Sequence, residues 1–171
     1  GVAAHYRLLS EASMVSGAPN PFFYVSSSEW NLYDYIREFC RKQNMPRGVF
    51  LLSAIKQLPD LLKTGQGRHA AKYVRIARIL KSYPHHRYVL LGDNSQEDPL
   101  IYEKLVNDFP GMIIAVYLRN IRPSKAGQAK AAIGRMETLG AQACFFAHSA
   151  EPVAHSRRIG LAAGETGMRF S

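Results

Sequence analysis

The sequence predicts an α/β domain in three layers, in which a mostly parallel sheet has helices on both faces. Short apolar runs alternate along the chain with stretches whose apolar residues recur at helical spacing. Two of these runs, 88–92 and 112–118, are apolar almost throughout, as is typical of parallel strands buried on both sides. The length of 171 residues, 47% of them hydrophobic, suffices for one core and is too short for two large domains. We therefore expect residues 1–171 to form a single domain.

The first half of the chain predicts two strands and two helices. A strand over 22–26 lies between a proline and a serine cluster, and helical spacing follows over 29–42. A second strand, 48–53, comes after a Pro-Arg-Gly turn. The helix over 70–83 ends before Pro84, which cannot continue the hydrogen bonds of a helix.

The second half continues the alternation. The strand over 88–92 precedes a helix over 98–108, which begins with a capping carboxylate and a proline at the first helical position. The rest of the pattern predicts a strand, a helix, a strand and a short final helix, over 112–118, 125–139, 142–147 and 151–163.

Charge is the unusual feature of the composition. Twenty-two Lys and Arg against thirteen Asp and Glu give a formal net charge of +9. The segment 63–87 holds seven basic residues, three histidines and no acid, so it should attract phosphorylated metabolites, an anionic membrane surface or nucleic acid. Nucleic acid is not favoured, because no binding motif is present and the aromatic residues lie in core-like patterns. A solvated helix face is the alternative explanation.

Other classes are excluded. No apolar run approaches the roughly 20 residues that span a bilayer, and the first residues lack the layout of a signal peptide. The two cysteines supply neither a disulfide framework nor metal-ligand spacing. We expect the protein in the cytoplasm or at the periphery of a membrane. Its oligomeric state stays open.

Candidate functional residues follow the predicted strands, because ligands of open parallel sheets bind beyond the carboxyl ends of the strands. Gly92 allows a sharp turn after which Asp93 could bind Mg²⁺, and Asp98 could hold the loop or the waters of the metal. The alternative is a tight turn followed by a capping aspartate.

Two further positions could bind phosphate. The Ser26 hydroxyl and the backbone N–H groups of Ser27 and Ser28, at the start of the predicted helix 29–42, could bind a phosphoryl oxygen. Lys72 could neutralise a phosphate. The alternatives are that Ser28 only caps the helix and that Lys72 is a surface lysine.

These residues occur in the order of a known family. Ser26, Lys72 and Gly92-Asp93 through Asp98 resemble motifs two to four of haloacid dehalogenase-like phosphatases. Phe23-Tyr24-Val25-Ser26 through Tyr33 resembles the Tyr-Val-Ser-x-Ser-Pro-Trp-x-Leu-Tyr signature of the actin-patch-protein type of phosphatidate phosphatase catalytic domain. Further similarity extends the resemblance over about residues 1–161, including 115–120 and the His155-Ser156 and Gly160-Leu161 pairs.

The resemblance implies a Rossmann-like, Mg²⁺-dependent phosphatase that converts phosphatidate to diacylglycerol and phosphate through an aspartyl phosphate. It implies that Asp93 binds Mg²⁺, Asp98 supports it, Lys72 holds the phosphoryl-aspartate and Ser26 binds a phosphoryl oxygen. Glu29 and Asn120 depart from the usual Pro and Asp of the family.

The family's first motif, Asp-x-Asp-x-Thr, is the largest departure. The five aspartates of this sequence include no Asp-x-Asp pair, so we expect the chain alone to be inactive and the nucleophile to lie upstream of residue 1, on the central strand of the sheet. Without that strand, two neighbouring strands would keep unpaired backbone groups. The alternative function is a non-catalytic phospholipid-binding or interaction module. The substrate is expected to be a phosphorylated small molecule or lipid.

Overall fold

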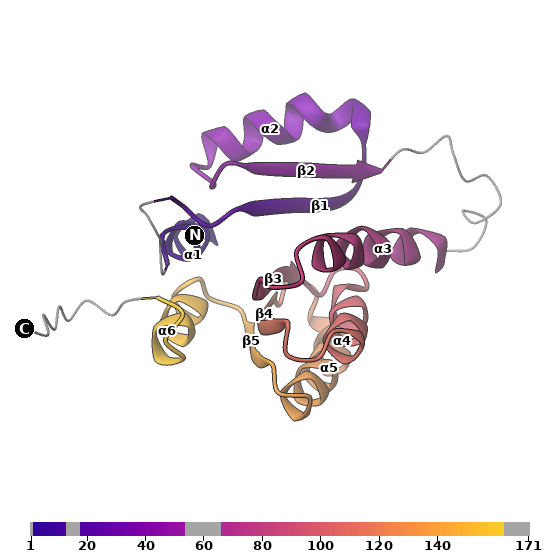
Figure 1. Cartoon of the computed structure of the whole chain (residues 1–171), viewed down its shortest axis with the longest axis vertical. Helices are drawn as coiled ribbons and strands as arrows, with labels where there is room; N and C mark the ends of the chain where they lie inside the picture. The colour runs from indigo at the N-terminus through magenta and orange to yellow at the C-terminus, as the bar shows by residue number, and fades with distance from the viewer. Residues whose placement is uncertain (1, 13–17, 54–65, 163–171) are drawn as a thin grey trace, which may run out of the picture.

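The structure is a computed structural model that describes residues 2–12, 18–53 and 66–162, with the backbone alone at 27–30, 53 and 66–69. Five strands and six helices alternate along the chain in these ranges (Figure 1). They are α1 (Val2–Glu11), β1 (Phe22–Glu29), α2 (Tyr33–Lys42), β2 (Gly48–Ser53), α3 (Gln66–Ser82), β3 (Tyr88–Asp93), α4 (Asp98–Asp108), β4 (Ile113–Arg119), α5 (Ala126–Thr138), β5 (Gln142–Phe146) and α6 (Ala150–Arg158). None of the described helices is long and apolar enough to cross a membrane.

All paired strands are parallel, which confirms the predicted α/β class. β1 pairs with β2, and β3, β4 and β5 form a second sheet in that order. The register places Asp93 opposite Arg119, and Arg119 opposite Phe146. The carboxyl ends of β3 to β5 therefore lie at one edge. Within the described residues β1 and β3 are not paired with each other, so the strands form two sheets and not one.

Helices cover both faces of the β3–β4–β5 sheet. On one face, α3, α4 and α5 enclose the main core, in which Leu105, Val116 and Leu118 are fully buried. Burying a side chain of this size stabilises the fold by roughly 1.5–3 kcal/mol. On the other face, a smaller cluster around Tyr117 packs near α6, which in turn contacts α1. The three layers of the prediction are present here (Figure 1).

A buried polar network fixes α1 and α6 to β4. His5 Nε2 lies 2.8 Å from Ser156 Oγ, which lies 2.7 Å from the Tyr117 hydroxyl. That hydroxyl lies 3.1 Å from His155 Nδ1. His5 is only 1% exposed, and its burial, with a smaller effect of His155, lowers the pKa of its imidazole to about 4.

Several predicted boundaries are wrong. β1 continues to Glu29, where it still pairs with Ser53, and the α2 helix begins only at Tyr33 after the short turn η1 (Trp30–Leu32). The final helix ends at Arg158 because Gly160 adopts a φ of 75°, a left-handed conformation that favours glycine after a helix end. The helix α1 was not predicted at all.

Candidate functional site

The β3–α4 turn presents a carboxylate beyond the sheet edge. The Asp93 Oδ1 atom accepts hydrogen bonds from the Ser95 backbone N–H, at 2.7 Å, and from the Ser95 hydroxyl. This short loop fixes the Asp93 side chain at the end of its strand. Gly92 is needed because a Cβ there would lie 2.6 Å from Asp98 Oδ2 and 2.8 Å from the Tyr102 hydroxyl.

An ion pair joins two of the residues that the sequence singled out. Lys72 Nζ lies 2.6 Å from Asp98 Oδ1, and the two side chains are only 14% and 10% exposed. Removing one partner of a pair this buried would leave the other charge buried and unpaired, which destabilises the fold. Lys72 is therefore no ordinary surface lysine. The predicted capping role of Asp98 is wrong, because Glu97 occupies the N-cap position of α4 without a capping side-chain hydrogen bond and Asp98 binds Lys72 instead.

The helix α3 also reaches the carboxyl half of β1. Arg75, one turn after Lys72, donates hydrogen bonds from Nη1 to the backbone oxygens of Ser26 at 2.7 Å and Leu51 at 3.1 Å. Residues three apart lie on one helix face. One face of α3 thus contacts both the Ser26 strand and Asp98, which brings these predicted residues into one region.

The predicted position of Ser27 and Ser28 at the start of a helix is wrong. Their backbones belong to β1, whose pairing with β2 is irregular after Val25 and resumes at Glu29. Their N–H groups consequently do not stand at the N-terminus of α2. The side chains of residues 27–30 lie outside the described part of the structure.

Two tyrosines surround the carboxylates. The Tyr102 hydroxyl donates a hydrogen bond to the Leu91 backbone oxygen at 2.8 Å, and the charges of Asp98 and Asp93 add to its burial in raising its pKa well above 10. Burial raises the pKa of Tyr6 to about 12, with smaller effects of Asp93 and Asp98. Both phenols thus stay protonated. Tyr6 comes from α1, so sequence reasoning missed it, although the spacing of His5 and Leu9 on one helix face was a usable signal.

Asn94 joins two of the loops at this edge, and the sequence predicted its place at a strand end but no role for its side chain. Its Oδ1 accepts hydrogen bonds from the backbone N–H groups of Ile121 at 2.8 Å and Arg122 at 2.9 Å. Its Nδ2 donates to Asn120 Oδ1 and to the Arg122 backbone oxygen, each at 2.9 Å. The Asn94 side chain is fully buried, so these bonds satisfy the whole amide group. Asn120 is used here as an acceptor, a role that the sequence did not suggest.

The site suits Mg²⁺ only in part. Asp93 supplies one hard oxygen ligand, and Mg²⁺ binds through one or two carboxylates together with waters and substrate phosphate. No cluster of three His, Cys, Asp or Glu side chains occurs among the described residues. Asp98 is already paired with Lys72. Among the described residues Asp93 would therefore be the Mg²⁺ ligand, and other oxygens would have to complete the shell.

The geometry is that of a parallel α/β domain with a charged, partly buried site at the carboxyl ends of its strands. Comparison with known proteins identifies the family: residues 1–120 match the model of the family described as "Phosphatidate phosphatase APP1, catalytic domain". The chain belongs to this family, as its sequence motifs predicted.

Two curated relatives show the extent of the similarity. The chain is 28% identical over 119 residues to the phosphatidate phosphatase APP1 of Saccharomyces cerevisiae, an alignment that covers 70% of this chain and 19% of the relative. It is 26% identical over 109 residues to an uncharacterized protein of Schizosaccharomyces pombe, covering 63% and 18%. The matches thus span about a fifth of the relatives' length. No solved structure matches the chain.

Proposed function

We propose that this domain forms most of the active site of a Mg²⁺-dependent phosphatase that acts on the phosphomonoester of phosphatidate. The observation that carries the proposal is the Lys72–Asp98 pair beside Asp93 at the sheet edge, in a chain of the phosphatidate phosphatase family. These three residues are, together with Ser26, the ones that the family motifs single out.

The residues of this chain would act on charge and position. Lys72 places its ammonium group against the phosphoryl oxygens, and Asp98 orients it from 2.6 Å. The Ser26 hydroxyl donates to a phosphoryl oxygen. Bound Mg²⁺ would offset negative charge on the phosphoryl group, and Asp93 would be its ligand from this chain.

The nucleophile is proposed to be an aspartate upstream of residue 1. Its carboxylate attacks phosphorus, the bond from phosphorus to the glycerol oxygen breaks, and diacylglycerol leaves with a proton from the neighbouring acid of the same motif. Water then hydrolyses the aspartyl phosphate to aspartate and inorganic phosphate. The division of the strands into two sheets between β1 and β3 supports this proposal, because a further parallel strand placed there would join them.

The test is phosphate release from phosphatidate by the natural full-length protein. We expect release with Mg²⁺, loss on chelation and recovery when Mg²⁺ is returned. Asp93→Asn should abolish release, whereas Asp34→Asn, at an exposed position of α2, should not change it. Full activity of Asp93→Asn, or activity that survives chelation, would contradict the proposal.

The second candidate is a binding module that holds a phospholipid without hydrolysing it. It is favoured by the lack of an Asp-x-Asp pair in the 171 residues. A full-length protein that retains phosphatidate vesicles but releases no phosphate in the same assay would support this candidate and exclude the first.

A further inference from the structure

The loop after β4 lies at the same sheet edge as Asp93. Residues 119–124, which we call the arginine loop, begin at Arg119, the residue in register with Asp93. They continue into the short turn η3 (Pro123–Lys125) before α5. Any partner of this loop would therefore meet the candidate active site.

The loop exposes an apolar side chain between two cations. Ile121 is 48% exposed, and Arg119 and Arg122 on either side of it are exposed too. No salt bridge joins either arginine to a carboxylate among the described residues, whereas the nearby Lys125 is paired with Glu97 at 3.1 Å. Two guanidinium groups are thus available to an anion beside an unburied isoleucine.

The exposure of Ile121 is imposed by the backbone. The Oδ1 atom of Asn94 accepts hydrogen bonds from the backbone N–H groups of Ile121 and Arg122. The Asn120 N–H donates to the Phe146 backbone oxygen at 2.7 Å. These bonds fix the loop to two neighbouring segments of the sheet edge. The isoleucine is held in solvent, although an isolated exposed apolar residue would by itself need no explanation.

We propose that the arginine loop is the contact between this domain and the surface of a bilayer that carries anionic phospholipids. Ile121 enters the interface between headgroups and acyl chains, and Arg119 and Arg122 bind lipid phosphates, which guanidinium groups match in geometry. This inference rests on the proposed function and adds to it the face by which the enzyme approaches its substrate. Docking there places Asp93 and Lys72 next to the headgroups.

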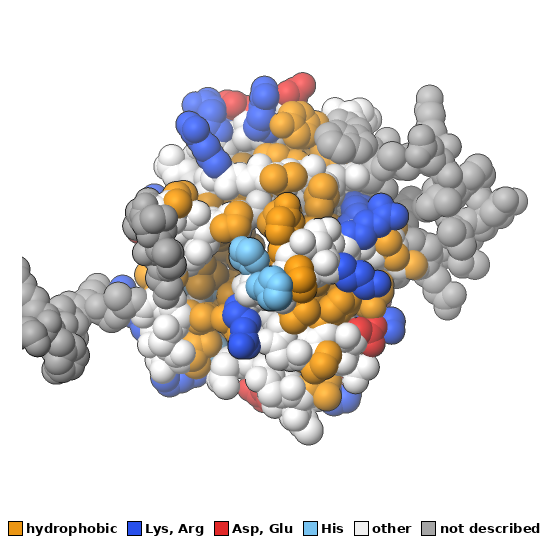
Figure 2. All heavy atoms as spheres, in the orientation of Figure 1, with side chains coloured by type: hydrophobic (Ala, Val, Ile, Leu, Met, Phe, Trp, Pro, Cys, Tyr) orange, Lys and Arg blue, Asp and Glu red, His pale blue; other side chains and the backbone are white. Residues whose placement is uncertain are grey.

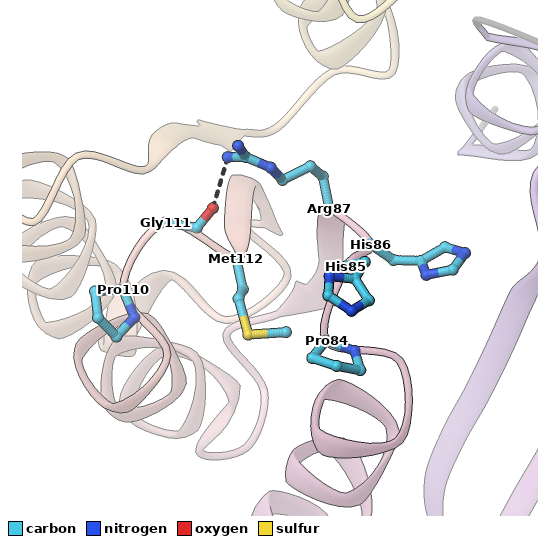
Figure 3. Close-up of a pocket in the computed structure, with 7 residues that line it drawn as sticks. All are labelled: Pro84, His85, His86, Arg87, Pro110, Gly111 and Met112. Atoms are coloured by element: carbon cyan, nitrogen blue, oxygen red, sulfur yellow. Dashed lines mark hydrogen bonds between the residues drawn. The ribbon is translucent and has the colours of Figure 1, made fainter.

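A competing basic surface lies at the opposite end of the strands. Lys81 to Arg87 are all exposed, and a hollow of about 400 Å³ is lined by Pro84, His85, His86, Arg87, Pro110, Gly111 and Met112 (Figure 3). Arg87 Nη1 donates to the Gly111 backbone oxygen at 2.8 Å. Histidine side chains also gather near the middle of the face seen in Figure 2, among hydrophobic and basic side chains.

The position of this second surface disfavours it as the docking face. It lies at the amino ends of β3 and β4, whereas Asp93 is the last residue of β3. At about 3.3 Å per residue, the length of β3 would keep a membrane bound there roughly 15–20 Å from Asp93. Headgroups bound at the hollow could not reach Lys72.

The experiment is flotation of the natural full-length protein with vesicles of phosphatidylcholine alone or of an equal mixture with phosphatidylserine. Phosphatidylserine is anionic but carries no phosphomonoester, so the result does not depend on turnover. We expect binding to the anionic vesicles only. Arg122→Gln should weaken it about fivefold, and Ile121→Ser about tenfold or more.

Matched controls lie at the amino edge of the sheet. Leu139→Ser removes an apolar side chain of similar exposure, 46%, and Arg87→Gln removes an exposed arginine beside the hollow. Both should bind vesicles as the unchanged protein does, and all four variants should keep its melting temperature. Unaltered binding by Ile121→Ser and Arg122→Gln, or a loss confined to the controls, would overturn the inference. Phosphatidate hydrolysis, measured separately, reports on the proposed function.

Discussion

His5 should make the stability of this domain depend on pH in the acidic range. Its imidazole is buried at 1% exposure, and Nδ1 has no hydrogen-bond partner among the described residues. Its pKa is therefore lowered from 6.5 to about 4, with burial as the main cause. A proton on this ring would put an uncompensated charge inside the contact between α1, α6 and β4.

The direction and size of the effect follow from the linkage of protonation to folding. Above pH 6.5 the ring is neutral in both states, and between pH 6.5 and about 4 only the unfolded chain binds the proton. Stability thus falls as the pH falls through this range. The drop from 6.5 to about 4, at ~1.4 kcal/mol for each unit, amounts to about 3 kcal/mol. The lowered pKa of His155 adds to it in the same direction.

The assay is the free energy of unfolding in urea, measured from pH 7 down to about pH 4. His5→Gln replaces the titrating ring by an amide that can still reach Ser156. Over this pH range the free energy of unfolding of the variant should therefore fall by about 3 kcal/mol less than that of the unchanged protein. His148→Gln, at an exposed position, is the matched control and should leave the pH dependence as it is. Equal pH dependence of the His5→Gln variant and the unchanged protein would refute this reasoning.

Three other substitutions probe the site. Lys72→Met should abolish activity and destabilise the fold by about 3 kcal/mol, because Asp98 then keeps an unpaired buried charge. Adding Asp98→Leu should restore stability but not activity, and a Lys72→Met variant as stable as the unchanged protein would contradict the pairing. Gly92→Ala should lower the free energy of unfolding in urea by about 1–3 kcal/mol, since its Cβ would overlap Asp98, and an unchanged free energy would contradict the close approach. Asn94→Ala should lower the free energy of unfolding by about 2 kcal/mol and speed hydrogen exchange at the backbone amides of Ile121 and Arg122, which Asn94 binds. Unchanged slow exchange at these amides would contradict their dependence on Asn94.

The sequence contained the separate parts of the site but not their pairing. Lys72 and Asp98 could each be selected from local patterns, since one lies on a basic helix and the other begins α4. That they meet at 2.6 Å depends on the packing of α3 against α4, which joins residues 26 positions apart. Local periodicity carries no information on such contacts. The strands β3 and β4 were predicted well because their apolar runs are long and bounded by clear turn residues.

Other features depended on long-range pairing. The serines after Val25 suggested the end of a strand, yet β1 runs on because Glu29 still pairs with β2. The helix α1 has weak local signals, and its position is fixed by the bond between His5 and Ser156, 151 positions away. Asn94 resembled an ordinary turn residue, since nothing in the local sequence indicates which backbone groups it will satisfy.

The two contacts of α3 have a consequence for local opening of the structure. Arg75 holds the carboxyl half of the β1–β2 pair, and Lys72, on the same helix, is the residue that we propose to bind phosphate. A ligand that fixes Lys72 also restrains the helix on which Arg75 depends, so binding raises the free energy needed to separate β1 and β2 from α3. Hydrogen exchange in β1 and β2 would then slow when a phosphate analogue binds, although the ligand contacts neither backbone ladder.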